Sequence, residues 1–388
     1  MNIRKIFVVA FTAVLCFFQL AVTAFCEPLC YENKVTEISV SASAAILIEA
    51  DTGTVLYAKN EKEHRSIAST TKIMTALLTL EAGDPDAPFT VDSTAILVEG
   101  TSMGLKQGDI VTRRALCYGM LLPSGNDAAN AAAINISGSY SAFAERMNDK
   151  AKALSMENSN FVTPSGLDAK GQYSCAYDLA VLTAYALKND DFKEICSKSS
   201  AKVSFGNPPY ERWLSNSNKL LRSYPDCIGV KTGFTDNARR TLVSAACRDG
   251  VTLIAVTLNA PDDWQDHTKM LDYGFSKVKC HSMSYDTKSL SLPVVGSDKD
   301  SVKLTSKEVS LPVTESQKSK VKATVHLPEF IYAGVKQGET VGIIEYILND
   351  RVIAKADIIT TEECKAKPQE VDFFTAIYKF IRKMLSLA

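Results

Sequence analysis

The chain has 388 residues, of which 46% are hydrophobic and 22% are charged, a composition typical of a folded protein long enough for two domains. Its net charge of −1 gives no electrostatic reason to expect a nucleic-acid partner. The sequence contains no glycine-rich phosphate loop and neither of the zinc-binding spacings H-x-H and H-E-x-x-H. Nucleotide chemistry and zinc-dependent hydrolysis are therefore disfavoured, and we expect neither a metal nor a cofactor.

The N-terminus has the pattern of an export signal. Arg4 and Lys5 precede an uncharged apolar run over residues 6–24, and Glu27-Pro28 ends the pattern. This is typical of a signal peptide, here residues 1–26, with an uncleaved membrane anchor as the alternative. In both cases the bulk of the chain is expected outside the cytoplasm. Nine cysteines lie beyond the apolar run without a C-x-x-C spacing, and we expect most of them to be free and buried.

The first large segment combines strands at both ends with helices between them. Apolar, β-prone runs at 44–50 and 54–59 flank Asp51-Thr52-Gly53, which predicts a β-hairpin. This order predicts an α/β (α+β) domain over residues 35–280, in which helices flank a mixed sheet. Helices are expected at 70–82, 113–122, 127–136, 140–154, 176–188 and 267–275, a surface loop at 101–108, and further strands at 228–232, 241–247 and 251–258.

Two shorter segments follow. Short β-prone runs over residues 284–365 predict a small all-β domain, which we expect to be a spacer because it carries no catalytic cluster. Over residues 369–388, aromatic and aliphatic side chains recur at helical spacing opposite Lys379 and Arg382. This pattern is typical of an amphipathic helix that lies on a membrane surface, and a helix that packs on its own protein is the alternative.

The segment Ser69-Thr70-Thr71-Lys72 begins the first expected helix. Residues i and i+3 share a helix face, so the Ser69 hydroxyl and the Lys72 amine can form a nucleophile–base pair. A free lysine has a pKa of ~10.4, and lowering it to about 7 requires roughly 4–5 kcal/mol from burial or a nearby positive charge. Because S-x-x-K recurs at Ser199, Ser276 and Ser319, the assignment of Ser69 and Lys72 as a catalytic pair needs evidence from other motifs in the chain.

Two later motifs supply that support. Ser124-Gly125-Asn126 falls between two expected helices, where the serine can relay a proton and the asparagine amide can hold a peptide carbonyl. Lys231-Thr232-Gly233 falls on an expected strand, where Gly233 allows substrate backbone to approach closely. Lys231 is also a candidate for the second cation that lowers the pKa of Lys72. S-x-x-K, an S-D-N-type motif and K-T-G occur together in class A β-lactamases and penicillin-binding proteins.

With these motifs the chain resembles the serine-type D-alanyl-D-alanine carboxypeptidases, the low-molecular-mass penicillin-binding proteins of peptidase family S11. The resemblance covers nearly the whole chain, and Gly166-Leu167-Asp168 and Gly171-Gln172-Tyr173-Ser174 contribute to it. It implies a β-lactamase/transpeptidase-like catalytic domain followed by a small β domain. Relatives often carry histidine before the Gly-Leu-Asp segment, where this chain has Ser165.

The resemblance also implies an activity: removal of the terminal D-alanine from peptidoglycan stem pentapeptides, which trims cross-linking in cell-wall synthesis. Ser69 would form the acyl-enzyme, and the backbone N–H groups of Ser69 and Phe234 would form the oxyanion hole. Lys231 and Thr232 would hold the terminal carboxylate. β-Lactam antibiotics would acylate the same serine, at the outer face of the cytoplasmic membrane or in the cell wall. The candidate residues are Ser69, Lys72 and Ser124 for catalysis, and Asn126, Lys231, Thr232, Gly233 and Phe234 for substrate binding.

Two other functions stay open. A class A-like β-lactamase would share Ser69, Lys72 and the K-T-G strand, but it needs fast deacylation, usually through a water held by a carboxylate. The extra β domain and the amphipathic tail fit a cell-wall enzyme better. A non-catalytic wall-binding scaffold on the same fold is the second alternative, although the complete set of candidate residues argues against it.

Overall fold

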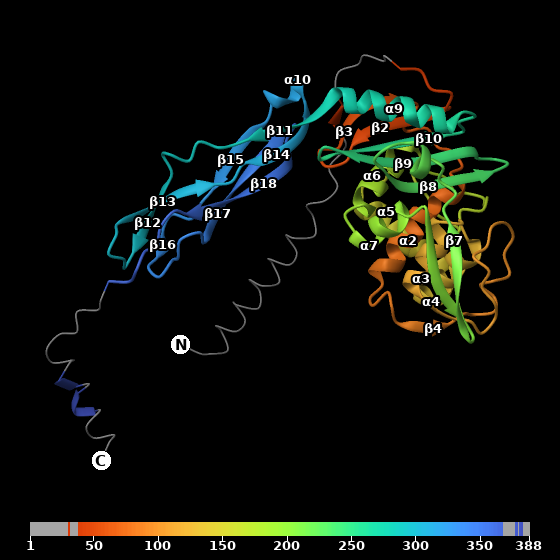
Figure 1. The fold of residues 1–388 in the computed structure, drawn as a ribbon, viewed down its shortest axis with the longest axis horizontal. Helices are drawn as coiled ribbons and strands as arrows, with labels where there is room; N and C mark the ends of the chain where they lie inside the picture. The colour runs from red at the N-terminus through yellow and green to blue at the C-terminus, as the bar shows by residue number, and fades with distance from the viewer. Residues whose placement is uncertain (1–29, 32–37, 368–376, 379, 383–388) are drawn as a thin grey trace. The chain divides into compact units, whose positions relative to one another are not determined.

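The computed structural model describes residues 30–31, 38–367, 377–378 and 380–382 (Figure 1). The predicted signal peptide, residues 1–26, and most of the predicted tail helix, residues 369–388, lie outside the described residues. The chain divides into two compact units. The first unit runs to Cys280 and includes Pro312–Lys318, and the second unit holds His281–Leu311 and the chain from Ser319 onward.

A six-stranded sheet forms the centre of the first unit, in the order β1-β3-β2-β10-β9-β8. Its neighbours pair antiparallel, except that β1 and β3 are parallel, so the predicted mixed sheet is confirmed. The predicted hairpin at 44–59 is confirmed as β2 and β3. The strands are β1 (Cys30–Tyr31), β2 (Ala44–Glu49), β3 (Thr54–Lys59), β8 (Cys227–Thr235), β9 (Arg239–Arg248) and β10 (Val251–Leu258).

Helices cover both faces of this sheet (Figure 1). Because successive side chains of a strand point to opposite faces, Ile46 and Ile48 of β2 join the larger core on one side, while Leu47 joins a second core with Met270 of α9 on the other. The larger core lies between the sheet and helices α2 to α7, whereas Leu220 of α8 belongs to the second core. The helices are α2 (Lys72–Glu81), α3 (Arg113–Leu121), α4 (Asn126–Ser137), α5 (Tyr140–Ala153), α6 (Ala176–Ala186), α7 (Asp190–Ser197), α8 (Leu220–Ser223) and α9 (Asp263–Lys277).

A small antiparallel sheet lies apart from the central one and was not predicted. Its order is β4-β5-β6-β7, and β6 and β7 form a long hairpin that leads into the residues before α8. Most β6 and β7 side chains are exposed, which explains why the apolar pattern is weak there. The strands are β4 (Pro88–Thr90), β5 (Ile110–Thr112), β6 (Ser200–Gly206) and β7 (Pro209–Ser215).

The second unit contains a six-stranded sheet in the order β15-β17-β18-β13-β12-β16, which confirms the predicted β domain. Buried Leu292 and Val294 alternate with exposed residues in β12, as expected for a sheet with one covered face. The strands of this sheet are β12 (Ser291–Val295), β13 (Ser301–Ser306), β15 (Lys322–His326), β16 (Ile331–Tyr332), β17 (Thr340–Leu348) and β18 (Arg351–Thr360). Two further strands, β11 (Val278–Met283) and β14 (Val309–Thr314), pair with each other, and α10 (Glu315–Lys318), which follows β14, belongs to the first unit.

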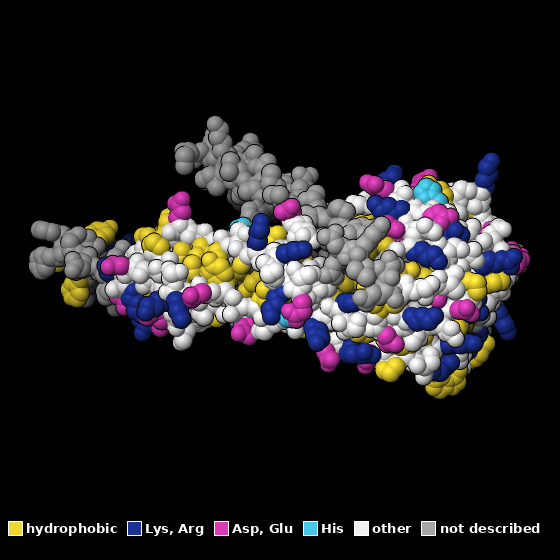
Figure 2. All heavy atoms as spheres, turned by 90° about the horizontal axis from the view of Figure 1, so that it is seen from above, with side chains coloured by type: hydrophobic (Ala, Val, Ile, Leu, Met, Phe, Trp, Pro, Cys, Tyr) yellow, Lys and Arg dark blue, Asp and Glu magenta, His cyan; other side chains and the backbone are white. Residues whose placement is uncertain are grey.

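Charges of both signs are mixed on the surface. Figure 2 shows Lys and Arg side chains interspersed with Asp and Glu on the visible face, in keeping with the net charge of −1. Within the described part of the chain, none of the helices has both the length and the apolar character that a bilayer crossing requires.

Glu49 is a buried carboxyl group at the end of β2. Its Oε2 atom accepts hydrogen bonds from the backbone N–H and the hydroxyl of Thr52, both at 2.7 Å. Burial, followed by the nearby charge of Asp51, raises the pKa of Glu49 from 4.5 to about 8. Folding therefore favours the protonated form of this group.

Replacing Glu49 by glutamine is expected to make stability less dependent on pH. A raised carboxyl pKa means that the native state binds more protons, so the free energy of unfolding falls as pH rises from 4.5 to about 8. The slope from one such group is at most about 1.4 kcal/mol per pH unit. Urea unfolding between pH 5 and 9 should show a flatter profile for Glu49→Gln than for the wild type. The exposed Glu63→Gln change is the control, and equal slopes in all three proteins would contradict the assignment.

Candidate active site

Ser69 and Lys72 meet at the start of the first long helix. The short 3-10 helix η1 (Ala68–Thr71) leads directly into α2, so both side chains lie on one face. The Lys72 Nζ atom lies 2.9 Å from the Ser69 hydroxyl oxygen. The pair inferred from spacing is therefore in hydrogen-bonding contact.

The Lys72 amine is fully buried and surrounded by oxygen acceptors. It donates to Asn126 Oδ1 at 2.7 Å and to the Ser165 backbone carbonyl at 2.6 Å. Burial is the main cause that lowers the pKa of Lys72 well below its ordinary value, and Lys231 lowers it further, whereas Asp127 opposes the shift. A lysine of lowered pKa can hold a neutral amine near physiological pH, which is the form that accepts a proton.

Lys231 lies on β8 and is 1% exposed. Its ammonium donates to the Thr232 backbone carbonyl at 2.7 Å, and burial lowers the pKa of Lys231 to about 7. It influences the Lys72 amine electrostatically but does not belong to the cleft lining. The structure thus places Lys231 behind the cleft wall rather than at its surface.

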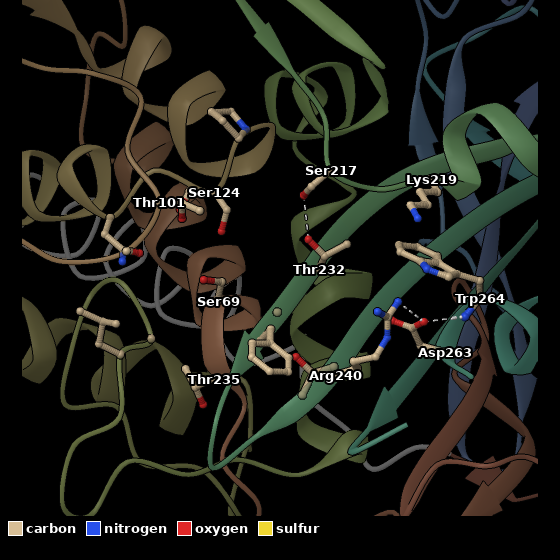
Figure 3. Close-up of a pocket in the computed structure, with 18 residues that line it drawn as sticks. Ser69, Thr101, Ser124, Ser217, Lys219, Thr232, Thr235, Arg240, Asp263 and Trp264 are labelled. Atoms are coloured by element: carbon tan, nitrogen blue, oxygen red, sulfur yellow. Dashed lines mark hydrogen bonds and ion pairs between the residues drawn. The ribbon is translucent and has the colours of Figure 1, made fainter. Parts of the chain in front are cut away.

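A cleft of about 470 Å³ opens above these residues (Figure 3). It is lined by Ser69 from η1, Ser124 from the α3–α4 loop, and Thr232 from β8. In Figure 3 Ser69 and Ser124 lie on one side of the cleft, and Thr232 lies across from them together with Ser217. The other sequence-predicted residues in its lining are Asn126, Gly233 and Phe234.

Ser124 and Asn126 are held by the opposite wall. Ser124 has a φ of 69°, in the left-handed region, and its carbonyl accepts a hydrogen bond from the Thr101 hydroxyl at 2.6 Å. The Asn126 amide uses both ends, because its oxygen accepts from Lys72 while its nitrogen donates to the Glu99 carbonyl at 2.7 Å. These contacts tie the S-x-N motif to the loop that carries Glu99 and Thr101.

Asp127 fastens the rest of that loop. Its carboxylate accepts hydrogen bonds from the backbone N–H groups of Met103, Gly104 and Leu105 at 2.9–3.0 Å. The Ser102 hydroxyl also donates to it at 2.6 Å. Asp127 lies in the first turn of α4, where its charge is favourable, and it additionally holds one wall of the cleft.

Gly233 brings β8 against the backbone of the nucleophile. A Cβ atom at this position would lie 3.1 Å from the Ser69 backbone nitrogen and 2.4 Å from the Thr241 hydroxyl. Only glycine permits this approach. The N–H of Ser69 and the strand that continues into Phe234 therefore border the same part of the cleft.

Gly166 makes an equally close contact on the other side of Ser69. Its φ is +84°, and a Cβ atom there would lie 2.0 Å from the Ala68 carbonyl oxygen. The neighbouring Ser165 contributes its backbone carbonyl to Lys72, and this contact does not depend on the Ser165 side chain. Serine in place of the histidine that relatives often carry at position 165 therefore keeps the backbone carbonyl that accepts the hydrogen bond from Lys72.

Changing Gly166 to alanine is expected to displace Ala68 and Ser69. The added methyl group overlaps the backbone of Ala68, so we expect a loss of several kcal/mol in stability and at least a tenfold slower acylation of Ser69. Gly171→Ala is a matched control, because φ there is +87° but the nearest atom to its Cβ is 3.7 Å away. Gly171→Ala should lower the free energy of unfolding only by the ~1–2 kcal/mol that a left-handed backbone costs an alanine. Thermal unfolding and penicillin labelling measure both effects, and equal losses in the two variants would exclude the close contact as the cause.

The other S-x-x-K pairs have different surroundings. Lys202 forms an ion pair with Glu211, and the Ser276 hydroxyl donates to the Tyr273 carbonyl. Among the described residues, only the Ser69–Lys72 pair joins a hydrogen-bond network with the S-x-N motif. Sequence reasoning missed the Ser165 carbonyl and the cleft residues Ser217, Lys219, Arg240, Asp263 and Trp264, since none of them belongs to a recognised motif.

Comparison with known proteins gives consistent matches. Residues 31–262 match the peptidase S11 family model, described as D-alanyl-D-alanine carboxypeptidase, and residues 275–366 match the C-terminal domain of penicillin-binding protein 5. The chain is 33% identical to the D-alanyl-D-alanine carboxypeptidase DacF of Bacillus subtilis, covering 86% of this chain and 88% of the relative. It is 32% identical to DacC of Escherichia coli, with coverages of 94% and 92%.

Solved structures give the same result. Penicillin-binding protein 5 from Haemophilus influenzae aligns with a TM-score of 0.63 and 28% identity, covering 86% of this chain and all of that chain. The DD-transpeptidase of Streptomyces K15 aligns with a TM-score of 0.59 and 33% identity, covering 62% of this chain and all of that chain.

Proposed function

Since the chain belongs to the D-alanyl-D-alanine carboxypeptidases of peptidase family S11, we propose that it removes the terminal D-alanine of peptidoglycan stem peptides through an acyl-enzyme on Ser69. The observation that carries this proposal is the buried Lys72 amine, 2.9 Å from the Ser69 hydroxyl. A hydroxyl nucleophile needs an adjacent base, and a desolvated lysine supplies one without a metal or cofactor.

In the acylation step, Ser69 Oγ attacks the carbonyl carbon of the penultimate D-alanine while its proton passes to the neutral Lys72 amine. The carbonyl oxygen becomes negative, and the backbone N–H groups of Ser69 and Phe234 stabilise it. Each such donor is typically worth about 3–4 kcal/mol. The close approach at Gly233 supports this pairing of the two N–H groups.

The C–N bond then breaks and the terminal D-alanine leaves. Its amine needs a proton, which Lys72 returns through the Ser124 hydroxyl. The Asn126 amide holds a carbonyl of the remaining peptide, and Thr232 binds the terminal carboxylate. Water then attacks the ester carbon while Lys72 takes its proton, the bond from that carbon to Ser69 Oγ breaks, and Lys72 returns the proton to Oγ, which restores the Ser69 hydroxyl.

A β-lactam carbonyl would react with the same serine. Its C–N bond lies within a ring, so the leaving amine stays attached after it opens and a long-lived adduct is expected. In the family model and the solved relative the name penicillin-binding protein describes this property. We therefore extend covalent penicillin binding to Ser69 of this chain.

We also propose that the protein acts outside the cytoplasm and that its chain consists of four segments. An N-terminal signal over 1–26 would direct export, residues 35–280 would hold the catalytic domain, residues 284–365 the β domain, and residues 369–388 a membrane-surface helix. In the described part of the tail, Ile377, Tyr378, Phe380 and Ile381 are helical and exposed, which supports an apolar contact there.

Removing residues 371–388 is expected to release the protein from membranes. The exposed aromatic and aliphatic side chains provide the apolar contribution to membrane binding, and the basic residues add attraction to anionic lipids. Flotation with vesicles that contain phosphatidylglycerol compares the full chain with the truncated one. Retention of the truncated protein would instead indicate an uncleaved N-terminus.

The function itself is tested by incubating the purified protein with fluorescent penicillin, mapping the labelled peptide, and measuring D-alanine release from a stem pentapeptide. We expect an adduct on Ser69 and release of one D-alanine per peptide. Rapid penicillin hydrolysis without an adduct would identify a β-lactamase. The absence of both reactions would favour the wall-binding scaffold.

A further inference from the structure

The loop between α5 and α6 reaches the helix of the nucleophile through residues 164–166. Two backbone carbonyls of this segment accept hydrogen bonds from α2, that of Pro164 from the Thr75 hydroxyl and that of Ser165 from the Lys72 amine, both at 2.6 Å. The loop, all of which the structure describes, contains isolated β-bridges but neither a helix nor a strand. A regular backbone ladder therefore does not fix the segment, and side chains have to hold it.

The Ser165 carbonyl determines which way the Lys72 amine faces. A neutral amine has two N–H donors and one lone pair. The Asn126 side-chain oxygen at 2.7 Å and the Ser165 carbonyl at 2.6 Å can only accept, so they take the two N–H groups. The lone pair is then left for the Ser69 hydroxyl, whose oxygen is 2.9 Å away. Since Ser165 acts through its backbone, the side chain that controls this contact belongs to another residue.

The Gln172 side chain joins the two ends of segment 164–166. Its Oε1 atom accepts hydrogen bonds from the backbone N–H groups of Val162 at 3.1 Å and Thr163 at 2.7 Å. Its Nε2 atom donates to the Leu167 carbonyl at 3.0 Å. Two of these partners are donors and one is an acceptor, which fixes the orientation of the amide. A single side chain thus bonds to the residues before the segment and to the residue after it.

Two further contacts strengthen this arrangement. The Thr163 hydroxyl lies 3.0 Å from Gln172 Oε1 and accepts a hydrogen bond from the Gly166 N–H at 3.2 Å. Next to Gln172, Tyr173 exchanges two backbone hydrogen bonds with Asn160, at 2.9 and 3.0 Å. The Gln172 amide is therefore carried by a backbone that is itself held in place.

We propose that Gln172 is a positioning residue for acylation: its amide holds residues 164–166 so that the Ser165 carbonyl orients the Lys72 amine toward Ser69. The inference rests on the proposed function and adds to it a residue that touches neither the substrate nor the reacting atoms. Gln172 does not line the cleft, and it takes no part in proton transfer. Its loss should therefore slow acylation without weakening the binding of a ligand.

The test measures the acylation rate constant with a chromogenic cephalosporin in Gln172→Met, which keeps the length of the side chain but removes the amide. We expect this rate constant to fall about 10- to 100-fold, the range expected when a reacting group is displaced by about 1 Å. The dissociation constant for the same cephalosporin, measured in a Ser69→Ala background, should stay unchanged. Gln172→Glu should recover part of the rate, because a carboxylate still accepts from the Val162 and Thr163 N–H groups.

Asn148→Leu is the matched control. The Asn148 side chain is half-buried like that of Gln172, and its amide bonds to the same loop through both ends, with the N–H and the carbonyl of Phe161 at 2.8 Å. It holds the loop before residue 162, so Asn148→Leu should lower the thermal unfolding temperature to a similar extent but acylate like the wild type. Equal slowing in both variants would overturn the proposal, as would wild-type rates in Gln172→Met.

Hydrogen exchange gives a readout that does not depend on activity. The Thr163 and Gly166 amides should exchange faster in Gln172→Met than in the wild type or in Asn148→Leu, because they lose the contacts that Gln172 organises. Unchanged exchange at both amides would contradict the proposal. A wild type that forms no penicillin adduct would instead contradict the proposed function, so the two failures can be told apart.

Discussion

Ser69→Ala is expected to abolish covalent penicillin labelling and to lower D-alanine release on the order of 10⁶-fold, the loss seen when a serine nucleophile is removed from a hydrolase. The change removes a hydroxyl from a partly exposed residue and leaves η1 intact, so the thermal unfolding temperature should stay close to that of the wild type. Intact-protein mass spectrometry after penicillin treatment measures the adduct directly.

The chain offers an internal control for this experiment. Ser276 belongs to another S-x-x-K segment but is exposed and bonded to the Tyr273 carbonyl. Ser276→Ala should label like the wild type. An adduct of unchanged mass and yield in Ser69→Ala would exclude Ser69 as the nucleophile.

Lys72→Met is expected to slow acylation by about 10²- to 10⁴-fold, the contribution typical of a positioned general base. Methionine has a similar length but cannot accept a proton, and it leaves the acceptors Asn126 Oδ1 and the Ser165 carbonyl without their donor. We therefore also expect a stability loss of about 1–3 kcal/mol. Stopped-flow acylation by a chromogenic cephalosporin and urea unfolding measure the two effects.

Lys72→Arg separates the base role from a purely electrostatic one. A guanidinium keeps the positive charge, but its pKa is above about 12, so it cannot supply a neutral amine. Both variants should be slow at every pH, whereas wild-type acylation should rise with pH as Lys72 loses its proton. Wild-type rates in Lys72→Arg would show that Lys72 acts only through its charge.

Much of the first unit could be predicted because its elements have strong local patterns. The β2–β3 hairpin has apolar runs around a turn, and α2 to α6 end within a few residues of their predicted limits. Elements with a polar exterior were less predictable. Helix α9 begins at Asp263 rather than at the predicted His267, because its first turn is stabilised by charge: Asp263 binds Arg240, which is distant in sequence.

In the candidate site, too, contacts set by local spacing could be predicted, and contacts between residues distant in sequence could not. Ser69 and Lys72 could be paired from spacing, because a helix converts three positions into contact. The contacts of Lys72 with Asn126 and Ser165 join residues 54 and 93 positions apart, and no local pattern specifies them. Backbone groups such as the Ser165 carbonyl have no signal in sequence at all, since every residue carries one.

The Asp127 carboxylate has a consequence for how ligands enter the cleft. It gathers three backbone N–H groups and one hydroxyl from residues 102–105, and it sits one position after Asn126 on α4. The wall opposite Ser69 is thereby held in place by the protein's own hydrogen bonds. Because these bonds need no contribution from a bound molecule, we expect the relative potency of substrates and β-lactams to depend on their fit to this wall and on their chemical reactivity.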